Sequence, residues 1–153
     1  MVDWSTLTPA EDLRGDDLQD THLLHEMLDA ATRFLERFSW CQDNRRRFFG
    51  WGIGGVVAVF LFEITPGDPG VDELLWVVAG DVPPAYLVTD DLSTPREALA
   101  GYVEAMNAWV TAARQGRSVA DLIPVNVEAT PANADLLARR LVFIEDEFSS
   151  SRD

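Results

Sequence analysis

Apolar side chains recur every three or four positions between residues 17 and 40, which is the spacing of one face of a helix. The members of this stripe are Leu24, Met27, Leu28, Ala31, Phe34, Leu35 and Phe38. We therefore expect an amphipathic helix that turns the whole stripe towards a core. The polar stretch 41–44 is expected to end it.

From Arg46 to Thr89 the pattern changes to that of β-strands. The predicted strands are residues 48–53, 56–64, 74–79 and 85–89. The first two flank Gly54-Gly55, which suits a tight hairpin because glycine tolerates positive φ. Proline and glycine make 65–70 a predicted loop. Four consecutive strands with short links indicate an antiparallel meander.

Both faces of the second predicted strand are apolar. One face carries Val57, Val59 and Leu61, and the other carries Ala58, Phe60 and Phe62. A sheet with one face in water would alternate apolar and polar residues. Either helices cover both faces, therefore, or helices cover one face and a partner subunit covers the other.

Two helices are predicted after the sheet. The first spans 95–115 and buries Leu99, Tyr102, Val103, Met106, Trp109, Val110 and Ala113, with Gly116 as its left-handed cap. The second spans Pro131 to about Phe148 and buries Leu137, Leu141, Ile144 and Phe148. Ser149–Asp153 is expected to be a frayed tail.

A threonine-proline pair begins each of three predicted helical segments. Thr8-Pro9-Ala10-Glu11 and Thr94-Pro95-Arg96-Glu97 match a capping box, in which the threonine hydroxyl caps the first turn. Thr130-Pro131 begins the third without the glutamate. The first box predicts a single turn that stops at Gly15, within an N-terminal arm formed by residues 1–16.

These elements predict an α+β fold: a four-stranded antiparallel β-meander, with one N-terminal helix and two C-terminal helices packed on it. At 153 residues, the chain is expected to be a single domain spanning 1–153.

Composition excludes several kinds of chemistry. The chain has no lysine, so a phosphate-loop lysine or a Schiff-base lysine is absent. The net charge of −14 repels nucleic acid and anionic membranes, so we expect neither as a partner. The single cysteine, Cys41, fits a reducing compartment, and the N-terminus resembles no signal peptide. A cytoplasmic location is therefore predicted.

The histidines His22 and His25 lie with Glu26 and Asp29 at helical spacing, a pattern that some metal sites use. All four project opposite the apolar stripe, however, so a solvated face is the favoured interpretation. A metal site and a pH-sensitive partner contact are the alternatives. No catalytic, cofactor or metal residue is assigned.

Charged residues near the predicted sheet are the other candidates. Asp81 and Asp90 lie at turns, where aspartate commonly satisfies backbone amides, although paired carboxylates also serve as general acid and base. Glu63 lies near the end of an apolar strand and needs a partner. An arginine of the cluster Arg45–Arg47 on the neighbouring strand is expected to supply it. Intramolecular salt bridges are the favoured role of that cluster, and binding of an anionic ligand or acidic segment is the alternative.

Several strings of the chain look similar to a family of small uncharacterised bacterial proteins. They are residues 75–91 (LWVVAGDVPPAYLVTDD), 98–102 (ALAGY) and 118–126 (SVADLIPVN). The resemblance covers about residues 48–143 and implies a bacterial origin and a single α+β domain. It implies no activity, cofactor or catalytic residue.

Five tryptophans are more than a core of this size can place centrally, and tryptophan is favoured at protein contacts. Together with the apolar sheet faces, they favour a non-catalytic protein-interaction module over an enzyme. We expect a homodimer or a basic protein partner, with an inhibitor or immunity protein as one form. The alternative is a small-molecule-binding or hydrolytic enzyme with a pocket between sheet and helices, lined by Arg46, Glu63, Asp81, Tyr86 and Asp90. Trp51 and Trp76 are the candidate contact tryptophans.

Overall fold

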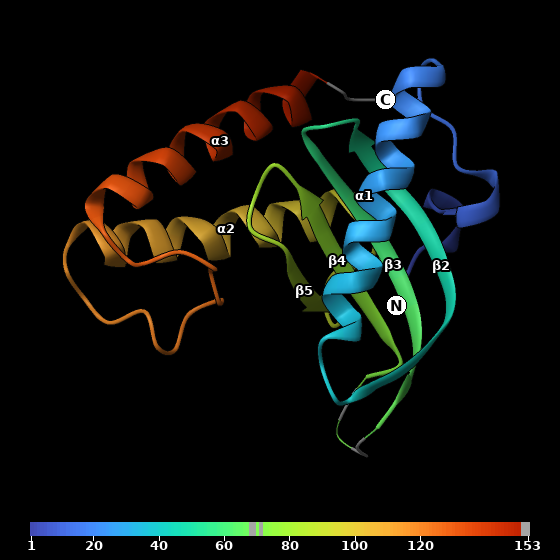
Figure 1. Cartoon of the computed structure of the whole chain (residues 1–153), viewed down its shortest axis with the longest axis horizontal. Coiled ribbons are helices and arrows are strands. Elements are labelled where there is room, and N and C mark those ends of the chain that lie inside the picture. Colours follow the sequence, from blue (N-terminus) through green and yellow to red (C-terminus); the bar gives the residue numbers. More distant parts are fainter. Residues whose placement is uncertain (68–69, 71, 151–153) are drawn as a thin grey trace. The chain divides into compact units, whose positions relative to one another are not determined.

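The computed structural model describes residues 1–67, 70 and 72–150, and within them one antiparallel sheet and three long helices (Figure 1). The elements are the 3₁₀ turn η1 (Trp4–Thr6), β1 (Thr8–Pro9), the 3₁₀ turn η2 (Ala10–Asp12), α1 (Leu18–Glu36), β2 (Cys41–Ile53), β3 (Val57–Pro66), β4 (Leu74–Gly80), β5 (Ala85–Val88), α2 (Pro95–Arg114) and α3 (Pro131–Ser150). The predicted α+β class, with one helix before the main strands and two after them, is confirmed.

The sheet has five strands in the order β1-β2-β3-β4-β5, so the prediction of four strands was wrong. The additional strand is β1, where Thr8 pairs with Phe49 and Pro9 pairs with Phe48. The expected helix cap at Thr8 does not form, because η2 begins after Pro9 without a side-chain cap. Proline is tolerated on β1 because an edge strand leaves one side of its backbone unpaired.

β2 is longer than its apolar pattern predicts, because it begins at Cys41 and includes the polar stretch that was expected only to end the helix. Its register against β3 shifts at three places, between Cys41 and Asp43, Asn44 and Arg46, and Phe49 and Trp51. Each shift is a bulge, which bends the strand and breaks the alternation of its side chains. The period of two is therefore hidden in the sequence of this strand.

The β2–β3 hairpin turns at Gly54-Gly55 as predicted, with Gly55 at a φ of 80°. The half-buried carboxylate of Asp20, in the first turn of α1, accepts hydrogen bonds from Gly54 N at 2.8 Å and Asp16 N at 2.9 Å. A Cβ atom at Gly54 would lie 2.4 Å from that carboxylate, so the close approach requires glycine. Asp20 thus joins the start of α1 to the end of the hairpin.

α1 packs on the sheet face that carries Ala58, Phe60 and Phe62 of β3 (Figure 1). Leu24, Met27, Leu28, Ala31 and Leu35 of its predicted stripe are buried there. Phe34 is half-buried and packs against this core, as predicted. Phe38 is half-buried and does not belong to the core cluster, so the expectation that the whole stripe faces a core was wrong for Phe38. The helix ends at Glu36, which places Phe38 beyond its last turn.

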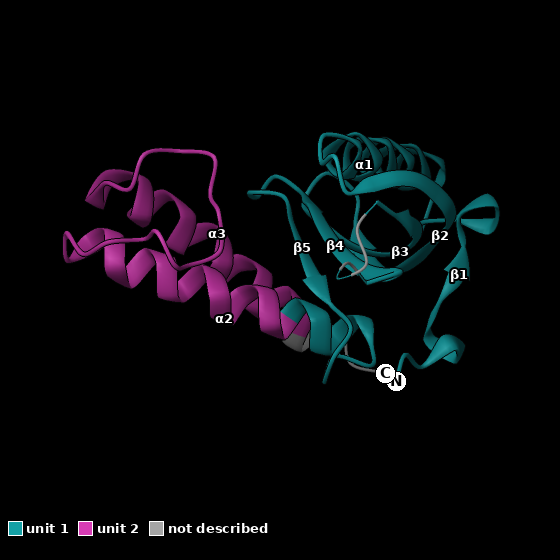
Figure 2. Ribbon diagram, turned by 90° about the horizontal axis from the view of Figure 1, so that it is seen from below, with its two compact units in different colours: residues 1–99 teal, residues 100–153 magenta. Residues whose placement is uncertain are grey.

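The chain divides into two compact units, residues 1–99 and 100–153 (Figure 2). α2 begins in the first unit at the predicted cap, where the Thr94 hydroxyl accepts from Glu97 N at 3.1 Å. The second unit holds the rest of α2 and all of α3, which Arg114 and Asp135 join by a salt bridge of 2.8 Å. That the two units form one domain stays a prediction from the chain length.

The predicted stripes of both C-terminal helices are buried, except for Phe148, which is partly exposed. α3 also presents large apolar side chains that are about half exposed, namely Leu136, Val142 and Phe143. Within the residues that the structure describes, no helix is long and apolar enough to cross a membrane.

Candidate functional site

Glu63 has the arginine partner that its position on β3 predicts. The Arg46 side chain donates a hydrogen bond to Glu63, and this bond lowers the pKa of the Glu63 carboxyl group. The Arg46 guanidinium also lies over the rings of Phe48, at 5.3 Å, and Trp4, at 5.8 Å. Because Arg46 and Glu63 neutralise each other, neither supplies an unpaired charge for a ligand.

The other predicted site residues lie apart from this pair. Asp81 follows β4, where its backbone N–H donates to the Val56 carbonyl at 2.9 Å, and Asp90 is exposed in the turn after β5. Trp51 is half-buried on β2, whereas Trp76 is fully buried and donates its indole N–H to the Leu92 carbonyl at 2.9 Å. The structure therefore does not assemble the predicted set into one pocket.

Tyr86 instead belongs to a cluster of four aromatic rings, which we call the aromatic cluster: Phe34, Phe38, Trp40 and Tyr86. Phe38 stacks on Trp40 with ring centres 4.9 Å apart. Tyr86 packs edge-on against both of them, at 5.4 Å and 5.1 Å. Tyr86 retains 37% of its exposure and Val88 of the same strand face retains 44%. The cluster is thus an apolar surface beside β5, the last strand of the sheet.

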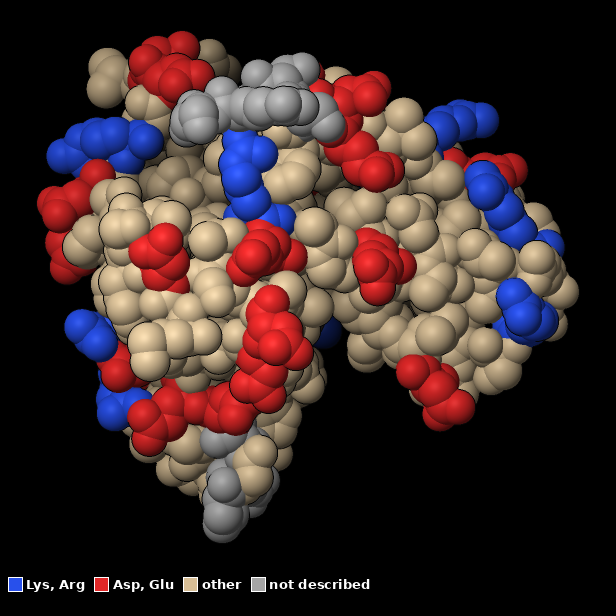
Figure 3. All heavy atoms as spheres, turned by 180° about the vertical axis from the view of Figure 1, so that it is seen from behind, with Lys and Arg blue, Asp and Glu red and all other residues tan. Residues whose placement is uncertain are grey.

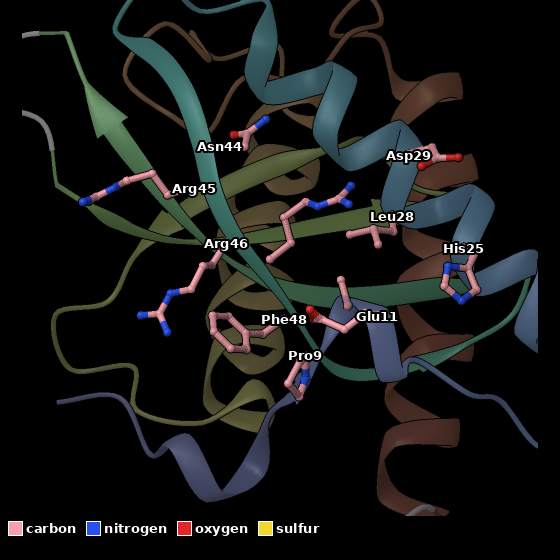
Figure 4. A pocket seen from close by; sticks show the side chains of 11 residues that line it. Pro9, Glu11, His25, Leu28, Asp29, Asn44, Arg45, Arg46 and Phe48 are labelled. Atoms are coloured by element: carbon pink, nitrogen blue, oxygen red, sulfur yellow. The ribbon is translucent and has the colours of Figure 1, made fainter.

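A polar cleft lies on the other flank of α1, and we call it the α1–β2 cleft (Figure 4). Its volume is about 640 Å³. The lining residues are Pro9, Ala10, Glu11, His25, Leu28, Asp29, Asn44, Arg45, Arg46, Arg47 and Phe48. Arg47 and Asn44 also line a smaller hollow of about 300 Å³, further along α1 and β2. These two residues therefore lie where the hollows meet.

The histidines take different roles. His22 is exposed and lies 3.6 Å from Glu26, which fits the predicted solvated face. The predicted solvated face was wrong for His25, which is half-buried because η2 and the segment after it lie beside α1, with its Nε2 atom 3.2 Å from the Leu13 carbonyl oxygen. Since a carbonyl only accepts, this contact places a proton on Nε2. No group of metal-ligating residues occurs in the part of the chain that the structure describes.

Cys41 lines the smaller hollow and is a free thiol. Partial burial raises the pKa of its thiol, and the Glu36 and Asp43 carboxylates raise it further. A raised pKa keeps the thiol protonated, and thiolate is the reactive form. This environment argues against Cys41 as a nucleophile.

No protein-family model matches this chain, and neither a curated protein nor a solved structure shows significant similarity to it. The two surfaces are therefore interpreted from their own geometry.

Sequence reasoning did not place Phe34, Phe38 and Trp40 in one cluster with Tyr86, and it did not distinguish Arg47 from its neighbours. One signal was present for the aromatic residues. Phe38 and Trp40 follow the last turn of α1 in a segment where polar residues predominate. No sequence signal distinguished Arg47 from Arg45 and Arg46, because the difference depends on a bulge that the sequence pattern does not show.

Proposed function

We propose that this protein is a non-catalytic protein-interaction module whose contact surface is the aromatic cluster beside β5. The partner that we propose is a protein segment rich in basic and apolar side chains. One observation carries the proposal: four mutually packed rings remain partly exposed next to an edge strand. Half-exposed tryptophan, tyrosine and phenylalanine side chains are typical anchors of protein contacts.

The edge strand supports this interpretation. β5 is hydrogen-bonded to β4 on one side and has no neighbouring strand on the other, within the residues described. An extended segment can add to such an edge through main-chain hydrogen bonds, while alternate side chains occupy adjacent pockets. Tyr86 and Val88 lie on the sheet face that carries the aromatic rings. They would therefore contact every second side chain of a segment that pairs with β5.

Charge supports a basic partner. The net charge of −14 attracts cationic segments over long range and accelerates their association at low salt. In Figure 3 the carboxylates are spread over the displayed face with arginines between them, so that face supplies a general negative field. Aromatic rings then contribute at short range, because arginine and lysine bind ring faces through cation–π contacts. An inhibitor of a basic protein in a reducing cytoplasm is one form of this proposal.

The test uses random twelve-residue peptides displayed on phage and selected on the purified protein. We expect enrichment of sequences that alternate basic and apolar residues. Phe38→Ala should weaken their binding at least about tenfold, which is the usual scale of an interface anchor. Phe143→Ala is the matched control, because it removes another half-exposed phenylalanine and should leave the affinity unchanged.

Selected peptides that bind Phe38→Ala as well as the parent protein would contradict the proposed surface. Sedimentation equilibrium tests the homodimer predicted from the sequence. A dimer that is lost in Phe38→Ala, with no peptide enriched, would assign the aromatic cluster to self-association and overturn the basic partner.

A further inference from the structure

Arg47 differs from the two arginines that precede it. Arg46 pairs with Glu63, and Arg45 lies 3.3 Å from Glu73 while donating to the Ile64 carbonyl at 2.8 Å. No carboxylate of the described residues forms an ion pair with Arg47. Arg47 is half-buried, and an arginine withdrawn from water needs an anionic or hydrogen-bonding partner.

A bulge separates the three side chains. The register shift between Asn44 and Arg46 interrupts the alternation of β2, and Arg47 pairs with Phe62 on the face that α1 covers. Figure 4 shows Arg45 and Arg46 extending away from α1, whereas Leu28 points from the helix into the cleft. The cationic group that remains for a ligand of the α1–β2 cleft is therefore that of Arg47.

Thr32 of α1, which lines the smaller hollow, holds the Arg47 guanidinium where that hollow meets the α1–β2 cleft. Its hydroxyl group accepts a hydrogen bond from Arg47 Nη1 at 3.2 Å and donates to the Leu28 carbonyl at 2.8 Å. A guanidinium has five N–H donors in a planar fork, so most of them stay available. That fork matches the two oxygens of a carboxylate.

The remaining charges of the cleft are negative. Glu11 and Asp29 line it, and neither forms a hydrogen bond or ion pair within the described chain. Pro9, Ala10, Leu28 and Phe48 supply apolar walls between them. A ligand carrying only an anionic group would gain from Arg47 but would be repelled by the two carboxylates. A ligand that also carries a cationic group would be attracted by all three.

We propose that the α1–β2 cleft binds a small zwitterionic molecule, with its carboxylate on Arg47 and its ammonium group towards Asp29 and Glu11. An aliphatic chain between the two charges would pack on Leu28 and Phe48. A cleft of about 640 Å³ has the size of sites that hold small organic ligands. The proposal does not depend on the aromatic cluster, which lies on the opposite flank of α1.

Three probes of matched length test it: 6-aminohexanoate, hexanoate and hexylammonium. Each is titrated into ¹⁵N-labelled full-length protein, and binding is followed by two-dimensional NMR. We expect 6-aminohexanoate to shift the amide signals of His25, Thr32 and Asn44 and to bind at least about tenfold more tightly than hexanoate, since like charges nearby penalise the anion. Arg47→Gln should abolish these shifts. Asp29→Asn should weaken the binding of 6-aminohexanoate without weakening the binding of hexanoate.

The matched control is Arg33→Gln, which removes one exposed arginine of α1 that lies outside the cleft lining. It should leave the titration unchanged. Thermal unfolding of each variant confirms that it is folded. Equal affinity for 6-aminohexanoate and hexanoate would overturn the proposal that the ligand is zwitterionic. Shifts that persist in Arg47→Gln would overturn the proposal that the ligand binds at Arg47.

Discussion

The two flanks of α1 face opposite edges of the same sheet and differ in chemistry. Towards β2 the helix presents polar residues: His25, Asp29, Thr32 and Glu36. Towards β5 it presents Phe34, which packs near Tyr86 with ring centres 6.5 Å apart. Between the flanks runs the buried stripe that holds the helix on the sheet. One helix thus serves two surfaces, because only the middle of its inner face is needed for the core.

The two edges differ in backbone as well. β2 is long and carries three bulges, and β1 pairs with only Phe48 and Phe49 of it. β5 has four residues and no bulge in its register with β4. Bulges re-aim side chains, and they do so where the arginine cluster lies. An irregular edge therefore produces a polar cleft, whereas a short regular edge leaves an apolar surface that suits strand addition.

The largest expected effect is on the free energy of unfolding, when the attachment of α1 to the β2–β3 hairpin is removed. Both surfaces depend on this attachment because both include residues of α1. Asp20→Ala removes the acceptor of the Gly54 and Asp16 amides. Hydrogen bonds to charged groups contribute about 1.5–3 kcal/mol each, and partial rearrangement recovers some of this. We expect the free energy of unfolding, measured by urea denaturation, to fall by about 2–3 kcal/mol.

Asp29→Ala is the control for Asp20→Ala, because Asp29 is an exposed aspartate of the same helix without a partner among the described residues. It should change the free energy of unfolding by less than about 0.5 kcal/mol. Equal free energies of unfolding for the two variants would show that the hydrogen bonds of Asp20 do not stabilise the contact between α1 and the β2–β3 hairpin.

A smaller effect, on ligand affinity, should show that the two surfaces bind independently of each other. Phe38→Ala should leave 6-aminohexanoate binding unchanged, and Arg47→Gln should leave binding of the selected peptides unchanged. Phe38→Ala should lose at least about tenfold in affinity for the peptides, or about 1.4 kcal/mol, and Arg47→Gln should abolish the signal shifts caused by 6-aminohexanoate. Both affinities are measured on both variants. A loss of both ligands in either variant would show that the two flanks are coupled through α1, contrary to the independence inferred from their geometry.

The smallest effect concerns the arginine that turns away from the cleft. Because Arg46 lowers the pKa of Glu63, the folded state favours the ionised carboxylate. The resulting stabilisation is present above the ordinary carboxyl pKa of about 4.3 and is lost as the pH falls through the lower folded-state value.

Urea midpoints measured between neutral and acidic pH should therefore fall more steeply for the parent protein than for Glu63→Gln. The difference should shrink in high salt, since the pair is partly exposed. Identical pH profiles would show that Arg46 does not favour the charged form of Glu63.

The long helices could be predicted because apolar periodicity and capping residues are local features of the sequence. The threonine-proline cap, however, gave one wrong prediction. Thr94-Pro95 caps α2 as expected, whereas the matching Thr8-Pro9 forms strand β1. The two pairs differ in the length of the helical segment that comes after them. Twenty helical residues come after Thr94, while only a three-residue turn comes after Pro9. A cap stabilises a helix that forms for other reasons, and so short a segment gains more from pairing with the edge of β2.

The candidate site was less predictable than the fold. Of the seven residues proposed from sequence, Arg46 and Glu63 are joined as expected, because their partnership follows from neighbouring strands. Tyr86 lies in the aromatic cluster with three residues that had been expected elsewhere in the fold or left unplaced. Arg47 became distinct only through the bulge beside it.

Local sequence patterns were sufficient for the α+β class, the hairpin at Gly54-Gly55, most of the buried stripe of α1 and the cap of α2, because each depends on residues close together in the chain. The same holds for the cap of α3, where the Thr130 hydroxyl accepts from Asn133 N at 3.2 Å. Tertiary structure alone decided which flank of α1 meets which edge of the sheet. It also decided which arginine of the cluster Arg45–Arg47 has no carboxylate partner among the described residues, and which aromatic rings remain partly exposed. Those outcomes depend on strand register and on where α1 ends over the sheet, and periodicity along one segment does not encode either of them.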